Sequence, residues 1–182
     1  VQLDTWLERI STAPLTAFDT ETTSLDPMRA EIVGLSFSVE PGIAAYVPVH
    51  HRYPGAPEQL SRDHVLNKLR HWLEDPSYPK LGQHLKYDSH VLANHGIALR
   101  GIVHDTLLQS YVLESHRSHD MDSLALRWLD RKTISYEEVC GKGASQIGFD
   151  EVAIQVVIPR IASKAVFLRA ILVGSGSCIS VA

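Results

Sequence analysis

The apolar residues at the start of the chain predict one helix followed by three strands. They first recur at i, i+3, i+4 and i+7, which is typical of a short amphipathic helix, at Leu3, Trp6, Leu7 and Ile10. Residues 15–21 then form a compact apolar run with a polar end, and apolar residues alternate with Gly and Ser over residues 33–39. Residues 43–49 follow a Pro-Gly turn and are rich in β-branched and aromatic residues, so they should pair with the preceding strand as an antiparallel hairpin.

Helical and strand patterns alternate after this hairpin. Helices are expected over residues 61–75, 87–95, 107–112 and 124–129, and a further one after the capping box that begins at Ser135. Short strands are expected over residues 80–84 and 101–105. Trp6, Trp72 and Trp128 fall on apolar helical faces and are expected in the core. The order of elements predicts an α/β fold, a mixed sheet with antiparallel leading strands that is flanked by helices.

Composition and charge narrow the class of protein. The chain has 182 residues, of which 45% are hydrophobic and 21% charged, as expected for one globular domain and not for a collagen-like or disordered chain. Its net charge of −4 argues against sequence-independent coating of duplex nucleic acid. The charge is uneven, because residues 152–182 contain no acidic residue and three basic ones, Arg160, Lys164 and Arg169. Residues 1–151 therefore hold 14 basic and 21 acidic residues, a net charge of −7.

The sequence shows no membrane or export signal. A membrane-spanning helix needs roughly 20 apolar residues, and the longest candidate, residues 165–173, is shorter and contains Arg169. The first residues lack the basic region and apolar core of a signal peptide. Cys140 and Cys178 match neither a zinc pair nor a redox motif, and no set of His and Cys residues has zinc spacing. A cytoplasmic protein without a membrane partner is expected.

Acidic residues follow two of the predicted strands. Asp19 and Glu21 stand at i and i+2 near the end of the first strand, so their side chains should point to the same face. Asp88 lies where the strand at residues 80–84 passes into a helix, and sites in such sheets gather at the carboxyl ends of the strands. Converging carboxylates repel one another unless a hard cation such as Mg²⁺ neutralises them. A solvated strand end is the structural alternative for Asp19 and Glu21. For Asp88 it is a helix cap, a role that can coexist with metal binding.

Three motifs carry a resemblance to a known family. Residues 18–22 read Phe-Asp-Thr-Glu-Thr, residues 82–88 read Gly-Gln-His-Leu-Lys-Tyr-Asp, and residues 119–124 read His-Asp-Met-Asp-Ser-Leu. In this order and spacing they resemble the proofreading 3'-5' exonuclease domain of the bacterial DNA polymerase I family, which has a ribonuclease H-like fold. The resemblance covers residues 1–155. It implies an enzyme of DNA replication and repair that hydrolyses DNA from a single-stranded 3' end with two Mg²⁺ ions, for which Mn²⁺ can substitute.

The resemblance also assigns roles to single residues. The match to Asp19 bridges both ions, the match to Glu21 ligates the ion that activates water, and the match to Asp88 helps to hold the second ion. The substrate-contact positions are occupied by Leu25, as a wedge against the terminal bases, and by Gln83, His84, Tyr87 and Tyr136. His84 stands where the family usually has Asn, so a hydrogen-bond donor is retained but its contact becomes protonation-dependent. Lys142 could contact phosphates, although a solvated position is the simpler expectation.

The family's last acidic motif, Tyr-x-x-x-Asp on a late helix, has no counterpart in this chain. An ungapped alignment from residues 149–153 places Arg160 and Lys164 at its two positions, and a cation at a metal-ligand position opposes metal binding. The divergent tail, residues 156–182, has Pro159 near the start of an apolar stripe at helical spacing, made of Ile158, Ile161, Ala165 and Leu168. Residues 174–177 are rich in Gly and Ser and should be flexible. A change of reading frame after Gln155, or divergence, would explain this tail.

Three functions stay open at the level of sequence. The first is a 3'-5' exodeoxyribonuclease whose activity is impaired by the missing fourth acid. The second is a non-catalytic nucleic-acid-binding or scaffold remnant of a DNA polymerase I, which keeps three acids but cannot position the second ion or the water. The third, with weaker support, is an RNA 3'-end exonuclease of the same superfamily. The expected partners are a single-stranded DNA 3' end and a polymerase domain absent from this chain.

Overall fold

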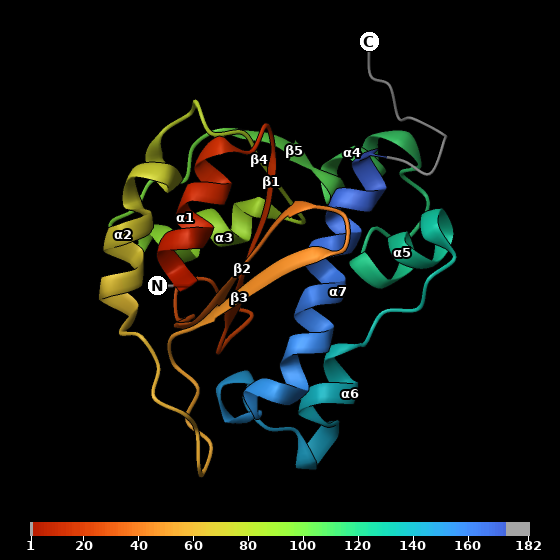
Figure 1. Ribbon diagram of the computed structural model, residues 1–182. Coiled ribbons are helices and arrows are strands. Elements are labelled where there is room, and N and C mark those ends of the chain that lie inside the picture. Colours follow the sequence, from red (N-terminus) through yellow and green to blue (C-terminus); the bar gives the residue numbers. More distant parts are fainter. Residues whose placement is uncertain (1, 174–182) are drawn as a thin grey trace.

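The computed structural model describes residues 2–173, whose strands form one five-stranded sheet in the order β3-β2-β1-β4-β5 (Figure 1). The strands are β1 (Thr16–Thr22), β2 (Ile32–Glu40), β3 (Ile43–Pro48), β4 (Lys80–Gly82) and β5 (Ile102–Asp105). β2 pairs antiparallel with both β1 and β3, whereas β4 pairs parallel with both β1 and β5. The predicted mixed sheet and its leading hairpin are confirmed.

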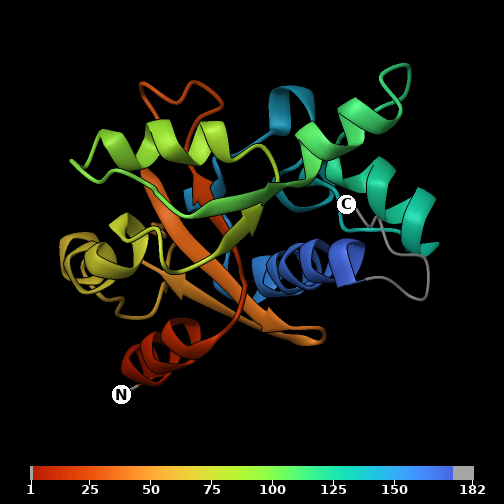
Figure 2. The ribbon, with the colours of Figure 1, turned by 90° about the horizontal axis from the view of Figure 1, so that it is seen from above.

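Helices cover both faces of this sheet. Within residues 2–173 they are α1 (Gln2–Thr12), α2 (Arg62–Glu74), α3 (Leu85–Ala93), α4 (Thr106–Leu113), α5 (Met121–Leu129), α6 (Tyr136–Cys140), α7 (Ile154–Val173) and the short 3-10 helices η1 (Gly143–Ser145) and η2 (Phe149–Glu151). α1, α2 and α3 enclose the main core, in which Phe18, Phe37 and Trp72 form an aromatic cluster. α7 packs against β1, β2 and β3 on the side opposite to α1 (Figure 2).

Alternation along β1 decides which side chains reach which helical layer. Phe18 belongs to the core under α1, α2 and α3, whereas Ala17 packs with Phe167 of α7 on the other face. Because side chains of a strand alternate between faces, Asp19 and Glu21 lie on the same side as Ala17. The two acids are therefore placed between the sheet and α7.

Local capping signals set the ends of several elements. Ser61 caps α2 by accepting a hydrogen bond from the His64 N–H, and the capping box at Ser135 starts α6. Gly96, just after α3, has a φ of 67°, in the left-handed region that glycine adopts without strain.

α7 differs from its prediction in where it begins and in its buried face. It starts at Ile154, so Pro159 lies inside the helix and not near its start. The buried face carries Val157 and Ile161, whereas Ile158 is 46% exposed, so the predicted stripe is right for Ile161 and wrong for Ile158. The side chains of Ala165 and Leu168, and residues 174–177, lie outside the described part of the chain. Neither α7 nor any other described helix is long and apolar enough to cross a membrane.

Trp128 is the second departure from the predicted core. Trp72 is buried and Trp6 packs at the edge of the same core, but Trp128 is 43% exposed. Trp128 belongs to α5, which packs against α7 at the rim of the molecule (Figure 1). A helix at the rim leaves part of its apolar face in solvent, and the sequence pattern of one helix does not show this.

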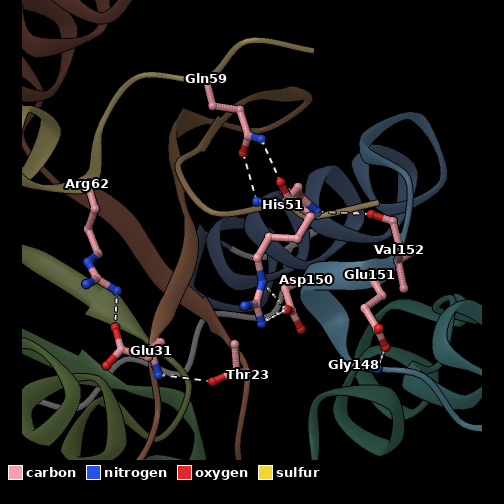
Figure 3. A network of polar contacts seen from close by, with 10 residues as sticks. Thr23, Glu31, His51, Gln59, Arg62, Gly148, Asp150, Glu151 and Val152 are labelled. Atoms are coloured by element: carbon pink, nitrogen blue, oxygen red, sulfur yellow. Dashed lines mark hydrogen bonds and ion pairs between the residues drawn. The ribbon is translucent and has the colours of Figure 1, made fainter. Parts of the chain in front are cut away.

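A polar network fastens the segment that leads into α7 to the loop after β3 (Figure 3). His51 Nδ1 lies 3.0 Å from the carbonyl oxygen of Val152, and Arg52 Nε donates to Asp150 Oδ2 at 2.9 Å. Gln59 steadies this loop through two hydrogen bonds with the backbone of His51, each of 2.9 Å. The start of α7 is therefore fixed relative to the sheet.

Candidate active site

The end of β1 carries two buried acids that face α7. Asp19 and Glu21 are 7% and 6% exposed. Lys164 Nζ, from α7, donates to Asp19 Oδ2 at 2.6 Å and to Glu21 Oε1 at 3.0 Å. Because one ammonium group contacts both carboxylates, the two side chains share one face, as their spacing predicts. The alternative of a solvated strand end is wrong.

Asp88 is the third acid and lies in the first turn of α3. It is 2% exposed, and its Oδ1 accepts hydrogen bonds from the Thr20 N–H at 2.9 Å and from the Thr20 hydroxyl at 2.6 Å. Thr20 stands between Asp19 and Glu21, so Asp88 is tied to the same strand end. The helix-cap alternative for Asp88 is wrong, since the residue that precedes α3 is His84 and the Asp88 carboxylate binds β1.

α7 supplies a second cation to these acids. Arg160 Nη1 lies 3.5 Å from Glu21 Oε1. Arg160 and Lys164 are at i and i+4, which places both on one face of the helix. Their side chains are 13% and 18% exposed, so the ion pairs with the acids are largely shielded from water. Shielded charges interact more strongly than charges on an open surface.

Burial and neighbouring charges shift the pKa values of this cluster. Burial raises the pKa of Asp19, an effect that Lys164 opposes and Glu21 reinforces. Burial also raises the pKa of Asp88 to about 7, and the charge of Asp19 adds to the shift. Burial lowers the pKa of Lys164, but the carboxylates of Asp19 and Glu21 outweigh this and hold it above its usual value. Lys164 is therefore a cation at neutral pH.

These acids have the oxygen donors that Mg²⁺ prefers, but their arrangement does not fit a pair of divalent ions. Lys164 Nζ already lies within hydrogen-bond distance of both Asp19 and Glu21. Within the described residues, no three His, Cys, Asp or Glu side chains are grouped as ligands of one ion. A divalent ion at this place would have to displace the ammonium group and would be repelled by Arg160.

One cleft of about 970 Å³ brings together all eight residues that the sequence assigned to the site. They are the acids Asp19, Glu21 and Asp88 and the candidate contact residues Leu25, Gln83, His84, Tyr87 and Tyr136. A volume of this size is at the upper end of the range of roughly 300–1,000 Å³ that is usual for ligand sites. The loop after β1, the start of α3 and the start of α6 thus form one surface.

Three of the contact candidates differ in how firmly they are held. Leu25 is 95% exposed in the loop after β1. The Tyr87 hydroxyl is 2.6 Å from the Thr22 hydroxyl, and Gln83 Nε2 donates to the His119 carbonyl at 2.6 Å. Tyr87 and Gln83 are therefore fixed in place, whereas the Leu25 side chain stands in solvent.

The other two candidates, His84 and Tyr136, contact elements beside the cleft. His84 has a φ of 62°, in the left-handed region that His and Asn enter more readily than most residues, and its N–H donates to Asp105 Oδ1 at 3.0 Å. Tyr136 stacks on Phe149 with ring centroids 6.3 Å apart. The Arg160 guanidinium lies 5.9 Å from the centre of the Tyr136 ring, so Tyr136 joins the cleft wall to α7.

The cleft also contains residues outside the eight that the sequence assigned to the site. Thr20 and Gln146 line it, and the partnership of Thr20 with Asp88 depends on the fold. Lys142, expected on a solvated face, lines the same cleft, and its Nζ is 3.1 Å from Glu137. Its place shortly after Tyr136 in the chain is the one sequence signal that points to this position.

Comparison with known proteins identifies the family. The chain matches the 3'-5' exonuclease family over residues 1–155. It is 54% identical over 165 residues to DNA polymerase I of Pseudomonas aeruginosa and 40% identical over 172 residues to DNA polymerase I of Rhizobium leguminosarum. These matches cover 89% and 85% of this chain but 18% and 17% of the two polymerases. The chain therefore spans less than a fifth of the length of these relatives.

Solved structures share the fold. The structure of the polymerase domain of Pol1 from M. smegmatis, in complex with DNA primer-template and dNTP, matches with a TM-score of 0.63 and 24% identity, over 93% of this chain and 25% of that one. NrnC of Brucella melitensis with bound Mg²⁺ matches with a TM-score of 0.58 and 20% identity, over 88% of this chain and 70% of that one. Such identities show the fold alone, and the likeness confirms the expected ribonuclease H-like architecture. The matches in sequence show that the chain belongs to the 3'-5' exonuclease family of bacterial DNA polymerase I, whose members are hydrolases.

Proposed function

We propose that this chain is the proofreading domain of a DNA polymerase I and acts on the single-stranded 3' end of DNA. The observation that carries the proposal is the convergence of three buried acids and five contact residues in one cleft. The domain comprises residues 1–155, and the tail, residues 156–182, contributes Arg160 and Lys164 of α7 to the wall of the site. It works in the cytoplasm beside a polymerase domain, which accords with the polymerase relatives of this family.

The cleft walls suit an unpaired 3' end. Tyr87 and Tyr136 offer aromatic rings on which bases of any type can stack, and Leu25 stands ready to pack against the terminal base. Gln83 and His84 add hydrogen-bonding groups that can hold the sugar-phosphate backbone. Stacking and backbone contacts do not depend on base identity, which a domain that removes any mispaired nucleotide requires.

Asp19, Glu21 and Asp88 are the residues that would hold Mg²⁺ ions and support hydrolysis, and they could do so only if Lys164 left Asp19 and Glu21. Bound ions would supply charge neutralisation and an activated water. Lys164 contacts Asp19 and Glu21 in the structure, and separating a buried ion pair costs on the order of 3 kcal/mol. This energy corresponds to a rate lower by about 100-fold, so we expect slow hydrolysis.

A second function is favoured by the ion pairs of Arg160 and Lys164 with the acids. If these contacts persist in solution, the domain binds a DNA 3' end without cutting it and acts as a non-catalytic binding module. A third function, the trimming of RNA 3' ends, uses the same cleft and differs in the preferred nucleic acid.

An exonuclease assay separates these functions. We expect 5'-labelled single-stranded DNA to be shortened slowly from its 3' end in Mg²⁺ or Mn²⁺, and a matched RNA to be shortened less. The control is Asp19→Ala, which removes a buried acid from the centre of the site and should abolish shortening. If the chain binds DNA but shortens it no more than this control does, the second function, a non-catalytic binding module, is supported. A chain that neither shortens nor binds DNA would overturn the proposal.

A further inference from the structure

We propose that Lys164 and Arg160 serve as the counterions of the acidic cluster in place of divalent ions, so that the cleft binds a single-stranded DNA 3' end without a divalent ion. The inference rests on the proposed function, because it concerns the same cleft and the same ligand. It replaces the family's metal ions by two side chains of the protein in neutralising Asp19 and Glu21.

The position of Lys164 is the first observation. Its ammonium group lies 2.6 Å from one carboxylate and 3.0 Å from the other, so a single cation bridges Asp19 and Glu21. A bridging cation is what two carboxylates on one strand face need, since unneutralised they repel each other and any approaching phosphate. The lysine is covalently part of α7, so a chelator cannot remove it.

Arg160 gives the second observation. Its guanidinium is shared between Glu21 and the ring of Tyr136, at 3.5 Å and 5.9 Å. Arg160 also lines the cleft. A planar guanidinium in a cleft wall is a suitable partner for a phosphate group.

The charge of the whole cleft supports the same conclusion. Among the described lining residues, the acids Asp19, Glu21, Asp88 and Glu137 face the cations Lys142, Arg160 and Lys164. Four acids and three cations leave a formal charge of −1, whereas the acids alone would give −4. Four uncompensated carboxylates would strongly repel a phosphodiester. A nearly neutral wall repels it much less.

The test is the affinity of the whole chain for a 5'-fluorescein oligothymidylate with a nuclease-resistant phosphorothioate 3' linkage, measured by fluorescence anisotropy in EDTA and in Mg²⁺. We expect the wild-type dissociation constants in the two solutions to agree within about threefold. Lys164→Met uncovers the acids and should weaken binding in EDTA by about tenfold or more, with recovery in Mg²⁺. The matched control is Lys132→Met, since the Lys132 side chain is 85% exposed and is not among the cleft residues.

The wild-type comparison decides between the outcomes even if Lys164→Met does not fold, which circular dichroism would show. Wild-type binding that requires Mg²⁺ would overturn this inference and leave the proposed function standing. Failure to bind in either solution would overturn the proposed function itself. Equal losses for Lys164→Met and Lys132→Met would also contradict the inference, because they would indicate a general effect of surface charge.

Discussion

Leu25 combines an apolar side chain with almost complete exposure at the rim of the cleft. It is 95% exposed, and it lines the same cleft as the acids and Tyr87. Fully burying a leucine side chain is worth about 1.5–3 kcal/mol, and a base docked in the cleft would cover part of it. Because the protein does not bury this side chain, its contribution belongs to binding and not to folding.

Leu25→Ala should therefore weaken binding of single-stranded DNA without changing stability. We expect a loss of about 1 kcal/mol, about fivefold in the dissociation constant, and an unchanged melting temperature. The matched control is Met28→Ala, because Met28 lies in the same loop, is 70% exposed and is not among the cleft residues. Anisotropy and thermal melting measure the two quantities. If Leu25→Ala and Met28→Ala bind DNA with the same affinity, Leu25 is not part of the binding surface.

Among the elements, α7 explains why an apolar pattern can misjudge a buried face. Val157, Arg160, Ile161 and Lys164 follow the spacing i, i+3, i+4 and i+7, so they form one face of the helix. Val157 and Ile161 are buried against Val33 of β2, and the two cations of the same face reach the acids of β1. A search for apolar residues alone omits the cations and shifts the stripe to Ile158. The buried face of α7 is half apolar and half ionic.

The anchor of α7 can be tested through stability. Arg52→Ala leaves the Asp150 carboxylate, 6% exposed, without its charged partner, and we expect the free energy of unfolding to fall by about 2 kcal/mol. Arg29→Ala is the matched control, because Arg29 is 84% exposed and lies 3.7 Å from Asp26, a surface pair worth less than about 1 kcal/mol. Urea unfolding gives both values. Equal changes would mean that the network of Figure 3 does not anchor the helix.

At the scale of the whole molecule, local patterns predicted the elements, and long-range contacts decided the rest. Periodicity and caps act within a few residues, so the order of helices and strands and the hairpin of β2 and β3 could be predicted. The exposure of Trp128 could not, because it depends on where α5 packs. The motifs and the family resemblance assigned eight residues to the site, and all eight line the cleft. The contact of Lys164 with Asp19 joins residues 145 positions apart and emerges only from the fold.

The fold brings the acidic and the basic parts of the chain together. The acid-free segment, residues 152–182, contributes Arg160 and Lys164 to the site, where they meet Asp19 and Glu21 from the part with a net charge of −7. The opposite charges of the two parts are thus paired inside one cleft. The late helix therefore still packs against the sheet, although cations stand where the family has its last acidic motif.

The central claim is that Lys164 and Arg160 take the place of divalent ions beside Asp19 and Glu21. Its most direct test is a calorimetric titration of Mn²⁺ into the wild-type chain and into the double variant Arg160→Tyr/Lys164→Asp. We predict no measurable binding by the wild type up to about 1 mM Mn²⁺. The double variant should bind with a dissociation constant below about 1 mM, because it loses two cations and gains a carboxylate. Equal affinity of the wild type and the double variant for Mn²⁺ would contradict the replacement of the metal ions by these side chains.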